Sequence, residues 1–205
     1  MLLPETLSAF ENFCEHAKKH GFEPKIESGY RSFDRQLLIW NEKAQGKRKI
    51  LDEQGKEINR ASLNDLALMK AILLWSALPG TSRHEWGTDI DVIDAAVAPA
   101  GYEAELTLEE SFGLFGNFHK WLGQQIASEN ACGFKRVFLP GIGRVQPEPW
   151  HLSYAPEAQK IERKFNAENL EERLKNSGIL LLPQILDNLE WILEGCVKCY
   201  FLPYP

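Results

Sequence analysis

Cysteine and long apolar runs are scarce in this sequence of 205 residues. The four cysteines are too few and too unevenly spaced for a disulfide framework. No apolar run approaches the roughly 20 residues of a membrane-spanning helix, and the N-terminus lacks the basic and then apolar pattern of a signal peptide. We therefore expect a cytoplasmic protein, or one of the periplasm or cell envelope if an upstream signal has been removed.

Basic residues are fewer than acidic residues in this sequence. Lys and Arg number 23 against 29 for Asp and Glu, which gives a formal net charge of -6. Nucleic acids and anionic membranes bind positive surfaces that displace counterions from phosphates, so neither is an expected partner. The length, with 44% hydrophobic and 25% charged residues, is typical of one globular domain. We expect residues 1–205 to form a single, monomeric domain.

The expected helices and strands follow one another without regular β-α-β alternation. Apolar periodicity and capping signals predict helices at residues 4–20, 33–44, 64–77, 107–126 and 156–175, with another after Pro183. Apolar or alternating runs predict strands at 23–28, 90–93, 134–139, 150–154 and 196–202, and residues 45–60 predict a loop or irregular hairpin. This order favours an α+β fold with a small antiparallel sheet flanked by helices.

Two short segments, residues 82–91 and 148–151, concentrate the side chains that carry chemistry. They contain two of the five histidines together with several carboxylates. Zinc prefers imidazole nitrogen and carboxylate oxygen, and a catalytic zinc takes three protein ligands and leaves a fourth position to water. His84, Asp91 and His151 make up such a set, and we predict that they bind zinc.

The spacing of these residues requires a bend in the chain. His84 and Asp91 cannot converge from one regular element, because seven residues span about 10 Å on a helix and alternate to opposite faces on a strand. Gly87 can adopt a positive φ without a steric penalty, so we expect the bend there. Pro149 disfavours helical geometry at Glu148, which places Glu148 on a loop. Three residues before His151, it is well placed to act as general base on zinc-bound water.

Together these residues resemble the zinc-dependent D-alanyl-D-alanine carboxypeptidases and dipeptidases of bacterial cell-wall metabolism (VanY-like), whose metal fold is shared by the hedgehog signalling domain. The family pattern is S-x-H-x-x-G-x-A-x-D followed by E-x-W-H, and it is matched by Ser82, His84, Gly87, Asp91, Glu148, Trp150 and His151. The segment S-G-Y-R-S at 28–32, with Gln36 downstream, resembles a further family motif. Asp89 departs from the pattern, because it stands where the family has alanine. The spacing still selects Asp91 as the metal ligand.

The resemblance implies a hedgehog or D,D-peptidase type of fold and a zinc metallopeptidase that acts on peptidoglycan stem peptides, as a D-alanyl-D-alanine carboxypeptidase. It implies that Glu148 is the general base and that Arg31 stabilises the oxyanion or binds a carboxylate. Ser82 and Trp150 are expected to contact substrate. Three alternatives stay open: an L,D-carboxypeptidase, an endopeptidase on muropeptides, and a zinc-containing binding module that does not hydrolyse.

Two further pairs of residues invite a metal or redox interpretation. His16 and His20 are four residues apart on the first predicted helix, beside two lysines, and we expect them on a solvated face. Cys196 and Cys199 fall on the last predicted strand, where alternation places them on opposite faces. We therefore expect these cysteines to be packing residues.

Overall fold

The computed structural model describes residues 1–202 and confirms the α+β class. Its sheet is antiparallel throughout, in the strand order β1-β2-β4-β3. The strands are β1 (Pro24–Ser28), β2 (Asp89–Asp94), β3 (Phe134–Arg136) and β4 (His151–Tyr154). The four strands expected in the first three quarters of the chain are therefore confirmed.

The chain divides into two compact units. Unit 1 consists of Met1–Tyr30, Trp86–Leu139 and Pro147–Arg163 and contains the whole sheet. Unit 2 consists of Arg31–Glu85, Pro140–Gln146 and the chain from Lys164 onward. Each unit has its own hydrophobic core.

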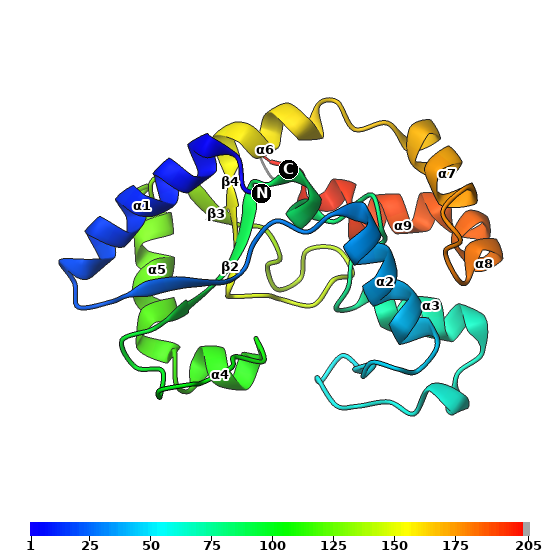
Figure 1. Cartoon of the computed structure of the whole chain (residues 1–205), viewed down its shortest axis with the longest axis horizontal. Coiled ribbons are helices and arrows are strands. Elements are labelled where there is room, and N and C mark those ends of the chain that lie inside the picture. The colour runs from blue at the N-terminus through cyan, green and yellow to red at the C-terminus, as the bar shows by residue number, and fades with distance from the viewer. Residues whose placement is uncertain (203–205) are drawn as a thin grey trace. The chain divides into compact units, whose positions relative to one another are not determined.

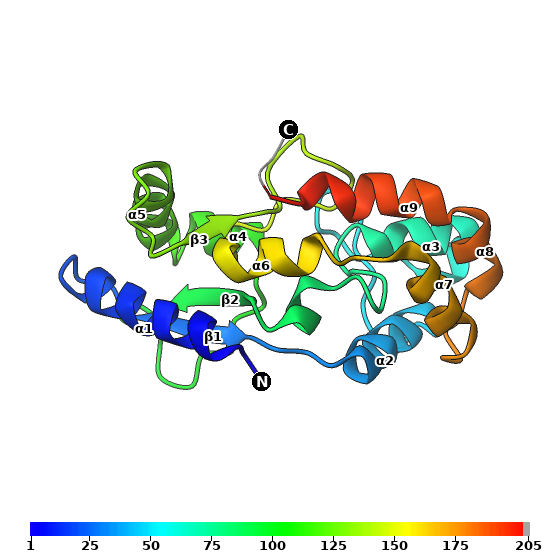
Figure 2. The same cartoon turned by 90° about the horizontal axis from the view of Figure 1, so that it is seen from above.

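In unit 1, helices α1 (Pro4–Lys18) and α5 (Gly116–Ala127) cover one face of the sheet (Figures 1 and 2). The residues buried between helices and strands include Phe13, Phe118, Leu122, Ile90, Val92 and Leu152. Side chains alternate along a strand. Because Ile90, Val92 and Leu152 point into this core, the residues between them on β2 and β4 project from the opposite face.

Unit 2 is helical. It contains α2 (Phe33–Ala44), α3 (Asp65–Leu73), α7 (Ala167–Lys175), α8 (Leu182–Asp187) and α9 (Leu189–Cys196). These helices enclose a core that includes Trp40, Leu68, Ile72, Leu174 and Ile192. Short 3-10 turns occur at Arg60–Ser62 and Lys198–Tyr200. The predicted irregular hairpin is present, with an antiparallel bridge between Leu51 and Glu57.

The helix expected from Thr107 to Ile126 is interrupted. Thr107 and Glu110 form the predicted capping box, but α4 (Leu108–Phe112) ends at Gly113 and α5 starts only at Gly116. Glycine is a poor helix former and a frequent helix terminator, which accounts for the break. Phe112, the last residue of α4, is 75% exposed.

The C-terminal part of the chain was predicted less well. The expected helix at 156–175 is two helices, α6 (Ala155–Glu162) and α7, because the Asn166 side chain accepts a hydrogen bond from the Asn169 amide and starts a new helix. The helix after Pro183 is likewise two, α8 and α9.

The strand expected at 196–202 is wrong. Helix α9 runs to Cys196, and a 3-10 turn follows, so the alternation argument for the two cysteines does not apply. Cys196 nevertheless packs against the core of unit 2, and burial raises the pKa of its thiol to about 12.

His16 also differs from its expected place. Its ring stacks on Trp121 at 5.7 Å between centroids, and its Nε2 lies 2.9 Å from Oε1 of Gln125. Only His20 of this pair is exposed. The solvated-face prediction is therefore wrong for His16.

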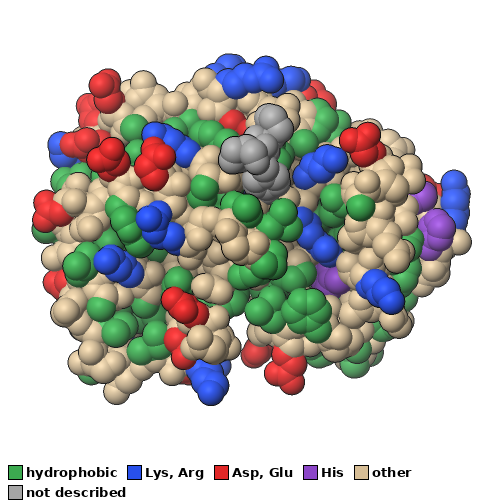
Figure 3. All heavy atoms as spheres, turned by 180° about the vertical axis from the view of Figure 1, so that it is seen from behind, with side chains coloured by type: hydrophobic (Ala, Val, Ile, Leu, Met, Phe, Trp, Pro, Cys, Tyr) green, Lys and Arg blue, Asp and Glu red, His purple; other side chains and the backbone are tan. Residues whose placement is uncertain are grey.

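Within residues 1–202, no helix is long and apolar enough to cross a membrane. On the face drawn in Figure 3, acidic and basic side chains are interspersed, and neither kind forms a continuous patch.

Candidate metal centre

The candidate centre starts from the two central strands of the sheet. The register of β2 and β4 pairs Asp91 with His151 and Asp89 with Ser153. Residues directly opposite each other in an antiparallel pair project from the same face. These four polar side chains therefore stand together on the face opposite the α1 and α5 core, and all four are buried.

His151 is held by carboxylates on both sides of its ring. Its Nδ1 lies 3.1 Å from Oδ1 of Asp91, and its Nε2 lies 2.9 Å from Oδ2 of Asp89. Only 1% of the His151 surface is exposed. Burial by itself lowers the pKa of His151, but the hydrogen bonds to Asp89 and Asp91 outweigh it and raise this pKa to about 10.

His84 lies in the 3-10 turn Arg83–Trp86, which runs across the residue at which the two units divide. The chain bends after this turn at Gly87, whose φ of 74° confirms the predicted left-handed conformation. An added Cβ there would lie 3.0 Å from the Met1 carbonyl oxygen. The bend therefore requires glycine for its backbone conformation and also for the close approach of the N-terminal segment.

His84, Asp91 and His151 each offer one ligand atom, and these atoms all lie within 4.8 Å of one another. All three residues are buried. Two imidazoles and one carboxylate are donors that suit zinc, and a set of three leaves one coordination position open. The donor set and its spacing therefore fit the predicted metal.

Glu148 lies on the loop before β4, as expected. Its amide donates to the Phe138 carbonyl at 3.1 Å, and its own carbonyl accepts from the His151 amide at 3.1 Å. Its carboxylate Oε2 lies 3.5 Å from Nδ1 of His151, and its side chain is 15% exposed. The carbonyl of Pro149 accepts from Arg136 at 2.9 Å, so the loop is held at two successive residues.

Arg31 is tied to neighbouring segments of unit 2. Its amide donates to the His84 carbonyl at 3.0 Å, and its guanidinium donates to Oε1 of Gln36 at 2.9 Å. Gln36 is 1% exposed and donates through Nε2 to the Ala77 carbonyl at 2.8 Å. Sequence reasoning noted Gln36 only as part of a motif, whereas the structure shows that it positions the Arg31 side chain.

Ser82 and Trp150, the two other predicted site residues, are both buried. The carbonyl of Ser82 accepts from the Glu85 amide at 2.9 Å, and the carbonyl of Trp150 accepts from the Val92 amide at 3.1 Å. These bonds anchor the backbone on which His84 and His151 lie. The predicted substrate contacts of the two side chains stay predictions.

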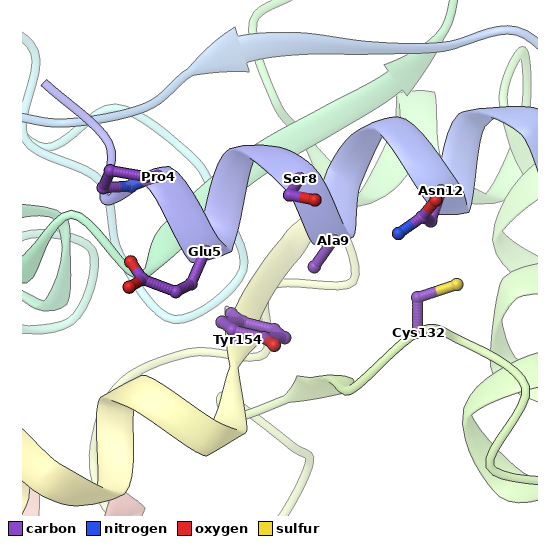
Figure 4. A pocket seen from close by; sticks show the side chains of 7 residues that line it. All are labelled: Pro4, Glu5, Ser8, Ala9, Asn12, Cys132 and Tyr154. Carbon is purple, nitrogen blue, oxygen red and sulfur yellow. The ribbon is translucent and has the colours of Figure 1, made fainter.

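A separate open hollow of about 600 Å³ lies beside α1 (Figure 4). It is lined by Pro4, Glu5, Ser8, Ala9, Asn12, Cys132 and Tyr154. None of the predicted site residues lines it, so this hollow is distinct from the candidate metal centre.

The chain resembles known proteins both in sequence and in structure. Residues 1–157 match the family model described as VanY: D-alanyl-D-alanine carboxypeptidase. An uncharacterized protein of Haemophilus influenzae is 42% identical over 77 residues, which are 38% of this chain and 53% of the relative. The putative carboxypeptidase YodJ of Bacillus subtilis is 28% identical over 173 residues, which are 82% of this chain and 51% of the relative. The chain therefore spans about half the length of these two curated relatives.

Solved structures with a similar fold include two peptidases. The LdcB LD-carboxypeptidase superposes with a TM-score of 0.52 and 28% identity, covering 75% of this chain and 58% of that one. The VanY D,D-pentapeptidase of a VanB-type resistance cassette, solved in complex with Zn(II), gives a TM-score of 0.50 and 23% identity, covering 90% and 83%. The second likeness supports the expected D,D-peptidase type of fold. The family match covers residues 1–157, more than half of the sequence, and the chain thus belongs to the VanY D-alanyl-D-alanine carboxypeptidase family.

Proposed function

We propose that this protein is a zinc-dependent carboxypeptidase that removes the terminal D-alanine from peptidoglycan stem peptides ending in D-Ala-D-Ala. The observation that carries the proposal is the His84, Asp91 and His151 cluster, with ligand atoms within 4.8 Å, in a chain of the VanY family. Zinc bound by these residues supplies polarisation of the scissile carbonyl and acidification of water.

Glu148 is the general base in this proposal. It takes a proton from the attacking water and delivers it to the leaving amine, so that the carboxylate is regenerated in each turnover. Two observations support the role. Its Oε2 lies 3.5 Å from Nδ1 of His151, and the side chain keeps 15% of its surface exposed, within reach of water.

Arg31 binds the free carboxylate at the end of the substrate. A planar guanidinium can hold a carboxylate by two parallel hydrogen bonds, and the contact with Gln36 restricts where it points. Stabilisation of the oxyanion is the other role open to this cation. Ser82 and Trp150 complete the proposed substrate-binding set, and we propose that the whole chain acts as one monomeric peptidase domain.

An L,D-carboxypeptidase is the second candidate function. It is favoured by the likeness to the LdcB LD-carboxypeptidase, at 28% identity and a TM-score of 0.52. The two activities differ in substrate. A D,D-carboxypeptidase shortens the pentapeptide stem to the tetrapeptide, whereas an L,D-carboxypeptidase shortens the tetrapeptide to the tripeptide.

The test is digestion of defined stem peptides by zinc-loaded protein, with the products identified by mass. We expect the pentapeptide to lose one alanine and the tetrapeptide to persist, and we expect a chelator to stop the reaction. Conversion of the tetrapeptide alone would replace the D,D assignment by the L,D one. If the protein bound stoichiometric zinc but hydrolysed no muropeptide, the proposed activity would be replaced by that of a zinc-containing binding module.

A further inference from the structure

Asp89 occupies the position at which the family pattern has alanine. It lies on β2, opposite Ser153 on β4, and its surface is 0% exposed. Burying a carboxylate is costly unless its oxygens accept hydrogen bonds. Its presence here therefore raises the question of which donors hold it.

Both oxygens of Asp89 accept from side chains. Oδ1 accepts from the hydroxyl of Thr88 at 2.6 Å and from the hydroxyl of Ser153 at 2.9 Å. Oδ2 lies 2.9 Å from Nε2 of His151. Because the two hydroxyls donate to Oδ1, the carboxylate is fixed with Oδ2 directed at the imidazole. An ionised carboxylate only accepts, so the proton of this contact belongs to Nε2.

The other ring nitrogen faces Asp91, a proposed metal ligand, and Glu148, the proposed general base. Nδ1 lies 3.1 Å from Oδ1 of Asp91 and 3.5 Å from Oε2 of Glu148. A metal ion held by Asp91 would therefore take the place of the hydrogen on Nδ1. The two nitrogens of His151 thus have different surroundings, and Asp89 is the residue that distinguishes them.

We infer that Asp89 is a positioning residue, which holds His151 in the tautomer with hydrogen on Nε2 and presents Nδ1 to zinc. The inference rests on the proposed zinc site. A carboxylate on the distal nitrogen of a ligating histidine fixes its ring and raises its basicity, and loss of such a partner typically weakens metal binding by roughly 10- to 100-fold. This chain gains that partner at a position where the family pattern offers only a methyl group.

The first experiment is NMR of the imidazole nitrogens in the unmutated protein, with and without zinc. His151 is assigned through the signals missing from His151→Gln. We expect zinc to shift Nδ1 of His151 while hydrogen stays on Nε2. Zinc on Nε2, with hydrogen on Nδ1, would overturn the inference. If zinc changed no histidine signal, the proposed zinc site itself would fail, and this inference with it.

The second experiment measures zinc affinity by competition with a chelator. We expect Asp89→Ala to weaken zinc binding by about 10- to 100-fold and Asp89→Asn, which keeps an acceptor oxygen, to weaken it less. Asp94→Asn is the matched control, since Asp94 is buried on the same strand but accepts from the backbone amides of Glu23 and Ala96. We expect its zinc affinity to be unchanged. A folded Asp89→Ala protein with the zinc affinity of the unmutated chain would also overturn the inference.

Discussion

Asp91 and His151 face each other directly across β2 and β4, with Oδ1 of Asp91 3.1 Å from Nδ1 of His151. Two of the three proposed zinc ligands are therefore set by the strand register. A slip of one residue in this pairing would turn the side chains of one of the two strands toward the α1 and α5 core, and would so separate Asp91 from His151. The same face carries Asp89, so the sheet positions the proposed ligands and the residue behind one of them together.

Replacing Glu148 by glutamine separates catalysis from metal binding. The amide keeps the shape of the side chain but cannot accept a proton, so we expect kcat to fall by about 100-fold or more. The zinc content should stay that of the unmutated protein, because Glu148 is not a proposed ligand. Steady-state kinetics and metal analysis check both expectations, with the exposed Glu194→Gln as control. Turnover that survived Glu148→Gln would rule out its role as base.

Replacing Arg31 by lysine keeps the charge and removes the planar pair of donors. We expect kcat/KM to fall by roughly 10-fold or more, mainly through a higher KM, because lysine cannot hold a carboxylate by two parallel bonds. Arg35→Lys, on the exposed surface of α2, is the matched control. A fall in kcat at unchanged KM would assign Arg31 to the oxyanion, and unchanged kinetics would remove it from the site.

The bend at Gly87 should resist substitution more than an open turn does. Gly87 and Gly101 have nearly the same φ, 74° and 75°. At either position alanine would be held in the left-handed conformation, which is unfavourable for a residue with a Cβ. Only at Gly87 does the new methyl group meet backbone, 3.0 Å from the Met1 oxygen and 3.3 Å from the Leu3 nitrogen.

We expect Gly87→Ala to lower the free energy of unfolding by about 1–3 kcal/mol more than Gly101→Ala. Denaturant titration of the two variants measures this difference. Equal losses of stability would show that the contact with the N-terminal segment does not constrain the bend.

The buried His119 should lower the free energy of unfolding as the pH falls. Burial, with a contribution from the Arg136 guanidinium, lowers its pKa to about 3, while in the unfolded chain it titrates near 6.5. Between these two pH values, His119 is therefore protonated in the unfolded state and neutral in the folded state. The stabilisation is complete above pH 6.5 and declines as the pH falls toward 3.

Between pH 7 and pH 5, we expect the free energy of unfolding of His119→Gln to fall by about 2 kcal/mol less than that of the unmutated protein. Unfolding free energies at both pH values check this, and His20→Gln, at an exposed histidine that follows α1, is the control. If the free energy of unfolding fell as much in His119→Gln as in the unmutated chain, His119 would not be the source of the acid sensitivity.

Local patterns predicted the sheet and the metal cluster, because both depend on features that a sequence carries directly. Alternation at Ile90 and Val92 marks β2, and the spacing of His84, Asp91 and His151 with a glycine between marks the bend. The chain's last segment was mistaken for a strand because a short apolar run does not distinguish strand from helix.

The partners of Asp89 could not be predicted from the sequence. They depend on the β2 and β4 register, which places Ser153 opposite Asp89, and on the direction of the His151 ring. The support that Gln36 gives to Arg31 is similar, since the Ala77 carbonyl that fixes Gln36 is 41 residues away along the chain.

The central claim is that zinc held by His84, Asp91 and His151 makes this chain a carboxypeptidase. Its most direct test is one measurement: the mass of the product formed from a pentapeptide stem ending in D-Ala-D-Ala, by protein of known zinc content, before and after chelation. We predict removal of a single alanine that requires zinc and returns when zinc is restored. Full activity in metal-free protein would contradict the claim.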